Sequence, residues 1–71
     1  MSQTYRKIIA DKVKGLRLQA GLNREELSLK LGFDNSYISK LENYRVNITI
    51  DKIEKIGEFF NVEPTYFFKL D

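Results

Sequence analysis

Gly32 separates two short stretches of chain whose apolar residues recur at helical spacing. Leu27 and Leu31 precede the glycine, and Ile38 and Leu41 follow it. Glycine readily takes the left-handed conformation in which many helices end. The pattern therefore predicts two short helices joined by a tight turn.

Apolar residues at helical spacing continue on both sides of this pair. No run alternates with the period of two that is typical of a β-strand, so we expect an all-α fold of five helices in one compact domain covering residues 1–71. The expected helices cover about residues 4–20, 24–31, 35–43, 50–60 and 64–69, with the helix pair and its turn at about 23–43.

Capping residues stand where several of these helices should begin. Asn23 is followed three positions later by Glu26, which is close to the spacing of a capping box. Asp34 and Thr49 offer side-chain oxygens to the first turns of the third and fourth helices. Pro64 suits the first position of the last helix.

The composition excludes several classes of function. The 71 residues contain no Cys and no His, so the chain cannot build a thiolate nucleophile, an imidazole base or a Cys/His zinc site. We therefore expect no enzyme activity, no metal and no cofactor. The chain also lacks an apolar run of about 20 residues and a signal-peptide-like start, so we expect a cytoplasmic protein with no membrane partner.

Charge is distributed unevenly along the chain. Residues 1–24 carry six basic residues and one acidic residue, whereas residues 25–71 carry six basic and nine acidic residues. The net charge of +2 is weak support for a nucleic-acid partner, and the gathering of basic residues at one end is stronger support.

The helix pair and its flanks read GLNREELSLKLGFDNSYISKLEN over residues 21–43. This run closely resembles the Cro and phage-lambda-repressor type of helix-turn-helix domain, and the likeness extends over about residues 9–68. The stretches 37–39 and 47–50 are similar to the small controller proteins of restriction-modification systems. The resemblance implies a lambda-repressor-like fold and a transcriptional regulator that binds double-stranded DNA.

Four positions depart from the pattern of the resembling family. Arg24 stands where the family usually has Gln, Ser28 where it has Ala, Tyr44 where it has Gly, and Ile48 where Pro is frequent. We expect Ser28 to add only a hydroxyl at a tight helix contact. Arg24 and Tyr44 lie near the expected DNA backbone.

One side of the expected third helix, covering 35–43, is polar, opposite the apolar Ile38 and Leu41. Asn can pair with adenine, Lys can reach the acceptors of guanine, and Ser can serve either role, so these side chains suit base edges in the major groove. An ordinary solvated helix face is the alternative. The expected base-reading residues are Asn35, Ser36, Ser39 and Lys40.

Further residues are expected at the sugar-phosphate backbone. Arg24, at the start of the second helix, is the best phosphate candidate because Arg donates to phosphate in a bidentate manner. Tyr37 either packs on the DNA backbone or a thymine methyl, or lies half-buried between the second and third helices. The resemblance places Asn43, Arg45 and Asn47 on the backbone, although a solvated turn has a similar composition. It also implies a partly buried structural ion pair between Arg17 and Glu42.

A homodimer is expected because one small domain contacts few base pairs, whereas a two-fold dimer reads two half-sites about 34 Å apart. Phe59, Tyr66 and Phe68 are the expected subunit contact, since aromatic residues are enriched at interfaces. The alternative is that these rings seal a small core. The alternative function is a protein-interaction module or antitoxin of the same fold, against which the basic residues around the third helix argue.

Overall fold

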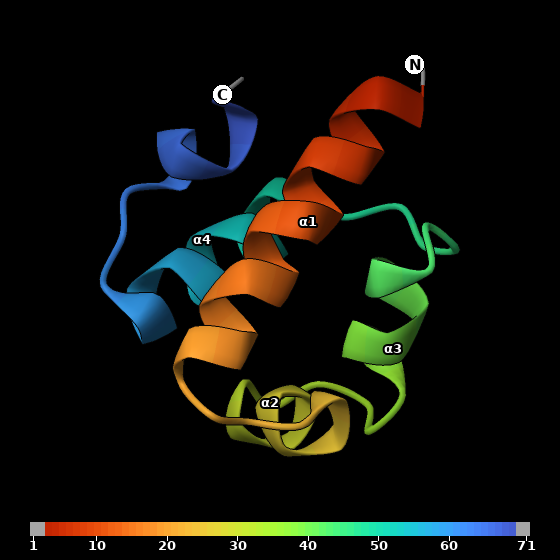
Figure 1. Cartoon of the computed structure of the whole chain (residues 1–71), viewed down its shortest axis with the longest axis vertical. Coiled ribbons are helices and arrows are strands. Elements are labelled where there is room, and N and C mark those ends of the chain that lie inside the picture. Colours follow the sequence, from red (N-terminus) through yellow and green to blue (C-terminus); the bar gives the residue numbers. More distant parts are fainter. Residues whose placement is uncertain (1–2, 70–71) are drawn as a thin grey trace.

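The computed structural model describes residues 3–69, and within this range it contains helices and no strands (Figure 1). The helices are α1 (Gln3–Gln19), α2 (Arg24–Lys30), α3 (Tyr37–Glu42), α4 (Ile50–Phe60) and the 3₁₀-helix η1 (Pro64–Phe68). Figure 1 shows α1 crossing the molecule diagonally, with α4 behind it and the two ends of the chain on the same side. None of the described helices is long and apolar enough to cross a membrane. The all-α prediction is confirmed.

The described range holds four α-helices, so the prediction of five is wrong in one detail. The last segment, η1, is a 3₁₀-helix. Its backbone bonds run from Tyr66 N to Glu63 O at 2.9 Å and from Lys69 N to Tyr66 O at 3.4 Å, both across three residues. A segment this short after Pro64 satisfies its backbone with the tighter 3₁₀ pattern.

The third helix also begins later than predicted, at Tyr37 and not at Asn35. The carboxylate of Asp34 accepts hydrogen bonds from the hydroxyl of Ser36 at 2.6 Å and from its backbone N–H at 3.4 Å. These bonds lower the pKa of Asp34 and hold Asn35 and Ser36 in a turn, because side-chain bonds of this kind compete with the helical pattern. Asp34 therefore shapes the turn before α3 and does not cap its first helical residues.

The other helix boundaries lie within one residue of the predicted ones. Asn23 Oδ1 accepts from Glu26 N at 2.8 Å and Glu26 Oε1 accepts from Asn23 N at 2.9 Å, which completes the capping box of α2. Thr49 Oγ1 accepts from the first turn of α4 at 3.2 Å. Gly32 has a φ of 77°, the left-handed conformation expected after α2.

Every helix contributes to one core, which fixes the helices relative to one another. The buried core residues are Ile9, Val13, Leu27, Leu31, Tyr37, Ile38, Leu41, Ile53, Ile56 and Phe67. Ile50 does not belong to this core, and 64% of it is exposed. It is the first residue of α4 and lies at the rim of the core.

Gly57 allows the segment after α4 to pass close to the helix. A Cβ atom at this position would lie 2.8 Å from the carbonyl oxygen of Val62. The backbone N–H of Val62 bonds to the carbonyl of Gly57 at 2.9 Å, so the chain turns back tightly here. This turn places Phe67 in the core.

Candidate nucleic-acid interface

The turn before α3 and the outer side of α3 form a polar edge, which we define as Asn35, Ser36, Ser39 and Lys40. Asn35 and Lys40 are exposed, and the two serines are half-buried. The opposite side of α3 is buried, which turns the polar edge away from the core. Asn35 Nδ2 makes a long contact of 3.4 Å with Glu25 Oε2, so its amide is only weakly held.

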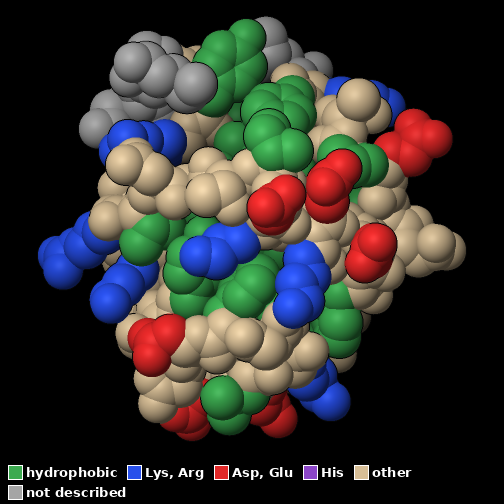
Figure 2. Space-filling model, turned by 180° about the vertical axis from the view of Figure 1, so that it is seen from behind, with side chains coloured by type: hydrophobic (Ala, Val, Ile, Leu, Met, Phe, Trp, Pro, Cys, Tyr) green, Lys and Arg blue, Asp and Glu red, His purple; other side chains and the backbone are tan. Residues whose placement is uncertain are grey.

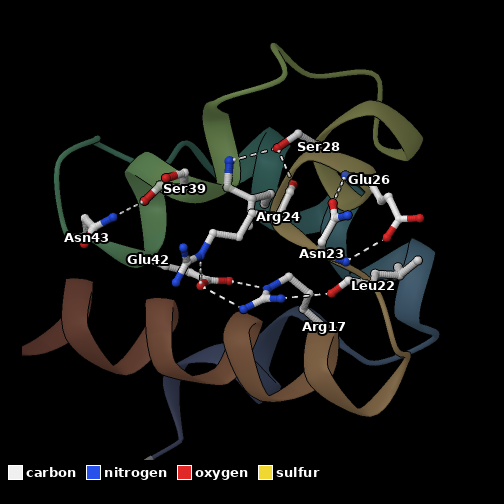
Figure 3. Close-up of polar contacts among 10 residues, drawn as sticks. Arg17, Leu22, Asn23, Arg24, Glu26, Ser28, Ser39, Glu42 and Asn43 are labelled. Atoms are coloured by element: carbon white, nitrogen blue, oxygen red, sulfur yellow. Dashed lines mark hydrogen bonds and ion pairs between the residues drawn. The ribbon is translucent and has the colours of Figure 1, made fainter.

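Ser28 joins α2 to α3. Its side chain is fully buried; the hydroxyl donates to the carbonyl of Arg24 at 2.9 Å and accepts from the backbone N–H of Ile38 at 3.0 Å (Figure 3). The first N–H groups of a helix have no partner inside the helix, and Ser36 makes no side-chain capping bond to α3. We expected the Ser28 hydroxyl only to add a small group at a tight helix contact. The structure shows that this hydroxyl fixes the start of the third helix.

The predicted ion pair between Arg17 and Glu42 is confirmed. Arg17 Nε and Nη2 donate to the two carboxylate oxygens of Glu42 at 2.7 and 3.2 Å, and Nη1 donates to the carbonyl of Leu22 at 2.9 Å (Figure 3). The side chains of Arg17 and Glu42 are 8% and 3% exposed. The pair ties the end of α3 to α1.

Arg24 also contacts this carboxylate, which sequence reasoning missed. Its Nε donates to Glu42 Oε1 at 3.0 Å, while 49% of the Arg24 side chain stays exposed. The available indication was the replacement of the usual Gln by a cation at the start of the helix that packs on α3. Figure 3 also shows the side chain of Asn43, directly after α3, bonded to the carbonyl of Ser39.

The loop after α3 is fastened to α1 at two places. Tyr44 has a φ of 61°, which agrees with the Gly usual here in the resembling family, and its hydroxyl donates to Asp11 Oδ1 at 3.2 Å. Lys7 Nζ bonds to Asp11 at 2.9 Å and lies 5.8 Å from the centre of the Tyr44 ring. The hydrogen bond with Asp11 raises the pKa of Lys7. Farther along the loop, Asn47 Oδ1 accepts from the guanidinium of Arg6.

The three loop residues expected at the DNA backbone are all exposed. Asn43 Nδ2 donates to the carbonyl of Ser39 at 2.8 Å, and Asn47 accepts from α1 as described. Arg45 lies between these two anchored residues. The loop thus presents a cation and two amides on a backbone that α1 supports.

Tyr37 lies in the core, with 8% of its surface exposed, so the outward position considered for its ring is wrong and the ring is buried more deeply than the half-buried alternative. Its ring meets Phe33 edge-on at 4.9 Å, and Lys52 Nζ lies 4.7 Å from its centre. Figure 2 shows basic side chains lying over hydrophobic ones in the middle of the rear face. Burial raises the pKa of Tyr37, and its hydroxyl has no hydrogen-bond partner among residues 3–69.

The three aromatic residues expected at a subunit contact do not lie together. Phe59 is 41% exposed and meets Phe60 edge-on at 5.0 Å. Tyr66 is half-buried, with Lys12 Nζ 5.0 Å from its ring centre. Phe68 is 39% exposed and lines a separate groove.

That groove has a volume of about 280 Å³ and lies between the start of α1, the loop before α4 and the end of η1. Tyr5, whose ring centre is 6.4 Å from that of Phe68, lines it together with Ile48 and Ile50. Figure 2 shows hydrophobic side chains gathered at this end of the molecule, beside the two ends of the chain. We define Tyr5, Ile48, Ile50 and Phe68 as the apolar end face.

Comparison with known proteins places this geometry in a family. The helix-turn-helix family model matches residues 13–67. The control protein C.BamHI of Bacillus amyloliquefaciens is 31% identical over 65 residues, which cover 90% of this chain and 80% of the relative. A hypothetical transcription factor of Neisseria meningitidis serogroup B is 33% identical over 60 residues, which cover 84% of this chain and 57% of that protein.

The structure agrees with the sequence comparison. The crystal structure of the hypothetical transcription factor NHTF from Neisseria superposes with a TM-score of 0.85 at 30% identity, and the match covers 90% of this chain and 74% of that chain. The resemblance drawn from residues 21–43 is thereby confirmed. The chain belongs to the helix-turn-helix family of DNA-binding transcriptional regulators.

Proposed function

We propose that this chain is a sequence-specific transcriptional regulator that reads the major groove of DNA with the polar edge. The observation that carries the proposal is the exposure of Asn35 and Lys40 beside a helix whose other side is buried. Amide and ammonium groups match the donor and acceptor patterns of base edges. The small serines between them let the edge approach the bases closely.

The phosphate contacts in this proposal come from the residues that flank the polar edge. Arg24 lies at the start of α2, and Asn43, Arg45 and Asn47 lie after α3, so donors stand on both sides of the base-reading residues. Phosphate contacts set the register of a protein on the duplex without carrying sequence information. Both kinds of contact are needed for selective binding.

The proposed active form is a homodimer on a two-fold operator. The apolar end face supports this assembly, because Ile50, Tyr5 and Phe68 are 64%, 42% and 39% exposed. Exposed apolar residues that gather in one place are typical of a surface that another molecule covers. Phe59 lines a different hollow, with Lys30 and Lys55, so we assign the contact to Phe68 and its neighbours.

A salt titration on mixed-sequence duplex DNA tests DNA binding directly. Release of counterions from phosphates predicts that the logarithm of the binding constant falls linearly as the logarithm of the salt concentration rises. Selection of bound duplexes from a random pool then tests for a two-fold operator. Binding that does not depend on salt, or a pool that stays random, would contradict the proposal and favour the protein-interaction module.

A further inference from the structure

Glu42 binds two arginines from two different helices. Its carboxylate, 3% exposed, accepts from Arg17 of α1 through both oxygens and from Arg24 of α2 through Oε1 (Figure 3). One carboxylate carries a single negative charge and each guanidinium a single positive charge. The cluster therefore retains one positive charge after Glu42 is neutralised.

The retained charge lies on Arg24, because the two arginines differ in exposure. Arg17 is 8% exposed, and all three of its side-chain nitrogens donate hydrogen bonds, two to Glu42 and one to the carbonyl of Leu22. Arg24 is 49% exposed, and its bond to Glu42 uses Nε. Neither Nη group of Arg24 has a partner among residues 3–69, so both can bind an acceptor outside the protein.

The geometry of the guanidinium links the bond from Arg24 Nε to Glu42 with the direction of the two Nη groups. Its nitrogens form a rigid planar fork, so a bond that fixes Nε restricts the direction of both Nη groups. A long side chain that is ordered before binding also loses less conformational entropy when it binds.

We propose that Glu42 is a positioning residue for DNA binding, and that it orients the Arg24 guanidinium toward a DNA phosphate. Arg17 pairs with the same carboxylate, and its positive charge lessens the repulsion between Glu42 and the phosphate. The inference rests on the proposed function. It implies that position 24 needs the fork of Arg and not merely a positive charge, since the ammonium of Lys is a compact point charge.

A pair of matched substitutions tests the need for the fork. Arg24→Lys keeps the charge at the position that contacts Glu42. Arg45→Lys makes the same change in the loop, where the side chain has no carboxylate partner among residues 3–69. Binding to a fluorescent mixed-sequence duplex is measured by anisotropy over a range of salt concentrations. We expect Arg24→Lys to bind about tenfold more weakly, the worth of one charge-assisted hydrogen bond. Its salt slope should fall by about one, because an ammonium held against Glu42 no longer pairs with a phosphate.

Arg45→Lys should lose markedly less affinity than Arg24→Lys, because a point charge can still reach a phosphate from an exposed loop. Arg24→Lys that binds like the wild-type protein, with an unchanged slope, would overturn the inference. A loss of the same size in Arg45→Lys would also overturn it, since the requirement for Arg would then not depend on Glu42.

A double-mutant cycle separates positioning from a merely structural role. The variants are Glu42→Gln, Arg24→Ala and the two combined, each measured at a temperature where circular dichroism shows it folded. If Glu42 acts through Arg24, Glu42→Gln weakens DNA binding in the wild-type background and has much less effect when Arg24 is absent. Equal losses in both backgrounds would overturn the role of Glu42. Should Glu42→Gln fail to fold, the lysine comparison decides alone.

The outcomes distinguish this inference from the function on which it rests. Absence of salt-dependent DNA binding by the wild-type protein would reject the proposed function. If the wild-type protein binds DNA and Arg24→Lys binds with the same affinity and salt slope, only the positioning of Arg24 by Glu42 is rejected.

Discussion

The hydroxyl of Ser28 on α2 accepts a hydrogen bond from the buried backbone N–H of Ile38 in the first turn of α3, at 3.0 Å. The same hydroxyl donates back into α2, to the carbonyl of Arg24. One fully buried oxygen thus links the two helices of the motif and sets where the third helix starts relative to the second. Because the polar edge depends on that start, this contact bears on both stability and DNA reading.

We expect Ser28→Ala to lower the free energy of unfolding by about 1–3 kcal/mol, because it leaves the N–H of Ile38 buried without a partner. Urea unfolding followed by circular dichroism measures the change. Ser36→Ala is the matched control: it removes a hydroxyl that bonds only to the exposed Asp34, so its effect should be much smaller. Equal losses of stability in the two variants would show that the buried hydrogen bond from Ile38 to Ser28 contributes no more to the free energy of unfolding than the exposed bond of Ser36.

Gly57→Ala should destabilise the protein by about 1–3 kcal/mol, as overpacking in a closely packed region does. The new Cβ would meet the backbone carbonyl of Val62, which cannot rotate away as a side chain would. Gly15→Ala on α1 is the contrasting variant, since no atom lies within 4 Å of its Cβ position. There the change should stabilise the helix by about 0.5–1 kcal/mol. Thermal unfolding of both variants checks the opposite signs.

Tyr37→Phe should leave DNA affinity unchanged and should not lower the free energy of unfolding. The hydroxyl it removes is buried without a partner among residues 3–69, and an unsatisfied buried group costs about 1–3 kcal/mol, so a gain in stability is expected. Tyr44→Phe, which removes a hydroxyl bonded to Asp11, should be mildly destabilising. Weaker DNA binding by a fully stable Tyr37→Phe would show that this tyrosine contacts DNA after all.

Asn35→Ala and Lys40→Ala should relax base selectivity at one or two operator positions, with a cost of about 1–3 kcal/mol on the preferred site for each lost bidentate contact. Binding of each variant to a panel of single-base operator changes measures this selectivity. Arg24→Ala is the comparison, because loss of a phosphate contact should weaken every duplex alike. A uniform loss in Asn35→Ala would place Asn35 on the backbone.

Ile50→Asp should shift the protein from dimer to monomer, because it places a charge on the most exposed residue of the apolar end face. Folding should survive, since an acidic residue in the first turn of a helix is favourable. Sedimentation equilibrium gives the oligomeric state. Phe59→Ser, in a different hollow, is the control and should leave the assembly intact. The dimer assignment would be lost if the wild-type protein is already monomeric at the concentrations that bind DNA.

Local chemistry explains which parts of the fold the sequence predicts. The capping box of Asn23 and Glu26 depends on residues three positions apart, and the buried Ile38 and Leu41 follow from helical spacing. The bonds from Ser28 to Ile38 and from Arg24 to Glu42 span 10 and 18 residues. Their geometry depends on how the helices cross, which spacing along the chain does not specify.

The burial of Tyr37 follows from helical spacing. Tyr37 precedes Leu41 by four positions, so both side chains lie on the same, buried side of α3 wherever the helix begins. The turn held by Asp34 and Ser36 delays the start of α3 by two residues and does not change this side. The pattern of Asp followed two positions later by Ser is a known turn former, and it was the indication available in the sequence.

The turn that holds Asn35 and Ser36 also has an evolutionary consequence. Asn35 lies outside α3 and its amide is only weakly held, so exchanging it should leave the helix that carries the core residues Ile38 and Leu41 undisturbed. A library randomised at Asn35 should therefore yield many folded proteins with new operator preferences, whereas one randomised at Tyr37 and Ile38 should yield few. Divergence of target sites among descendants of this chain can begin in that short segment while the scaffold stays constant.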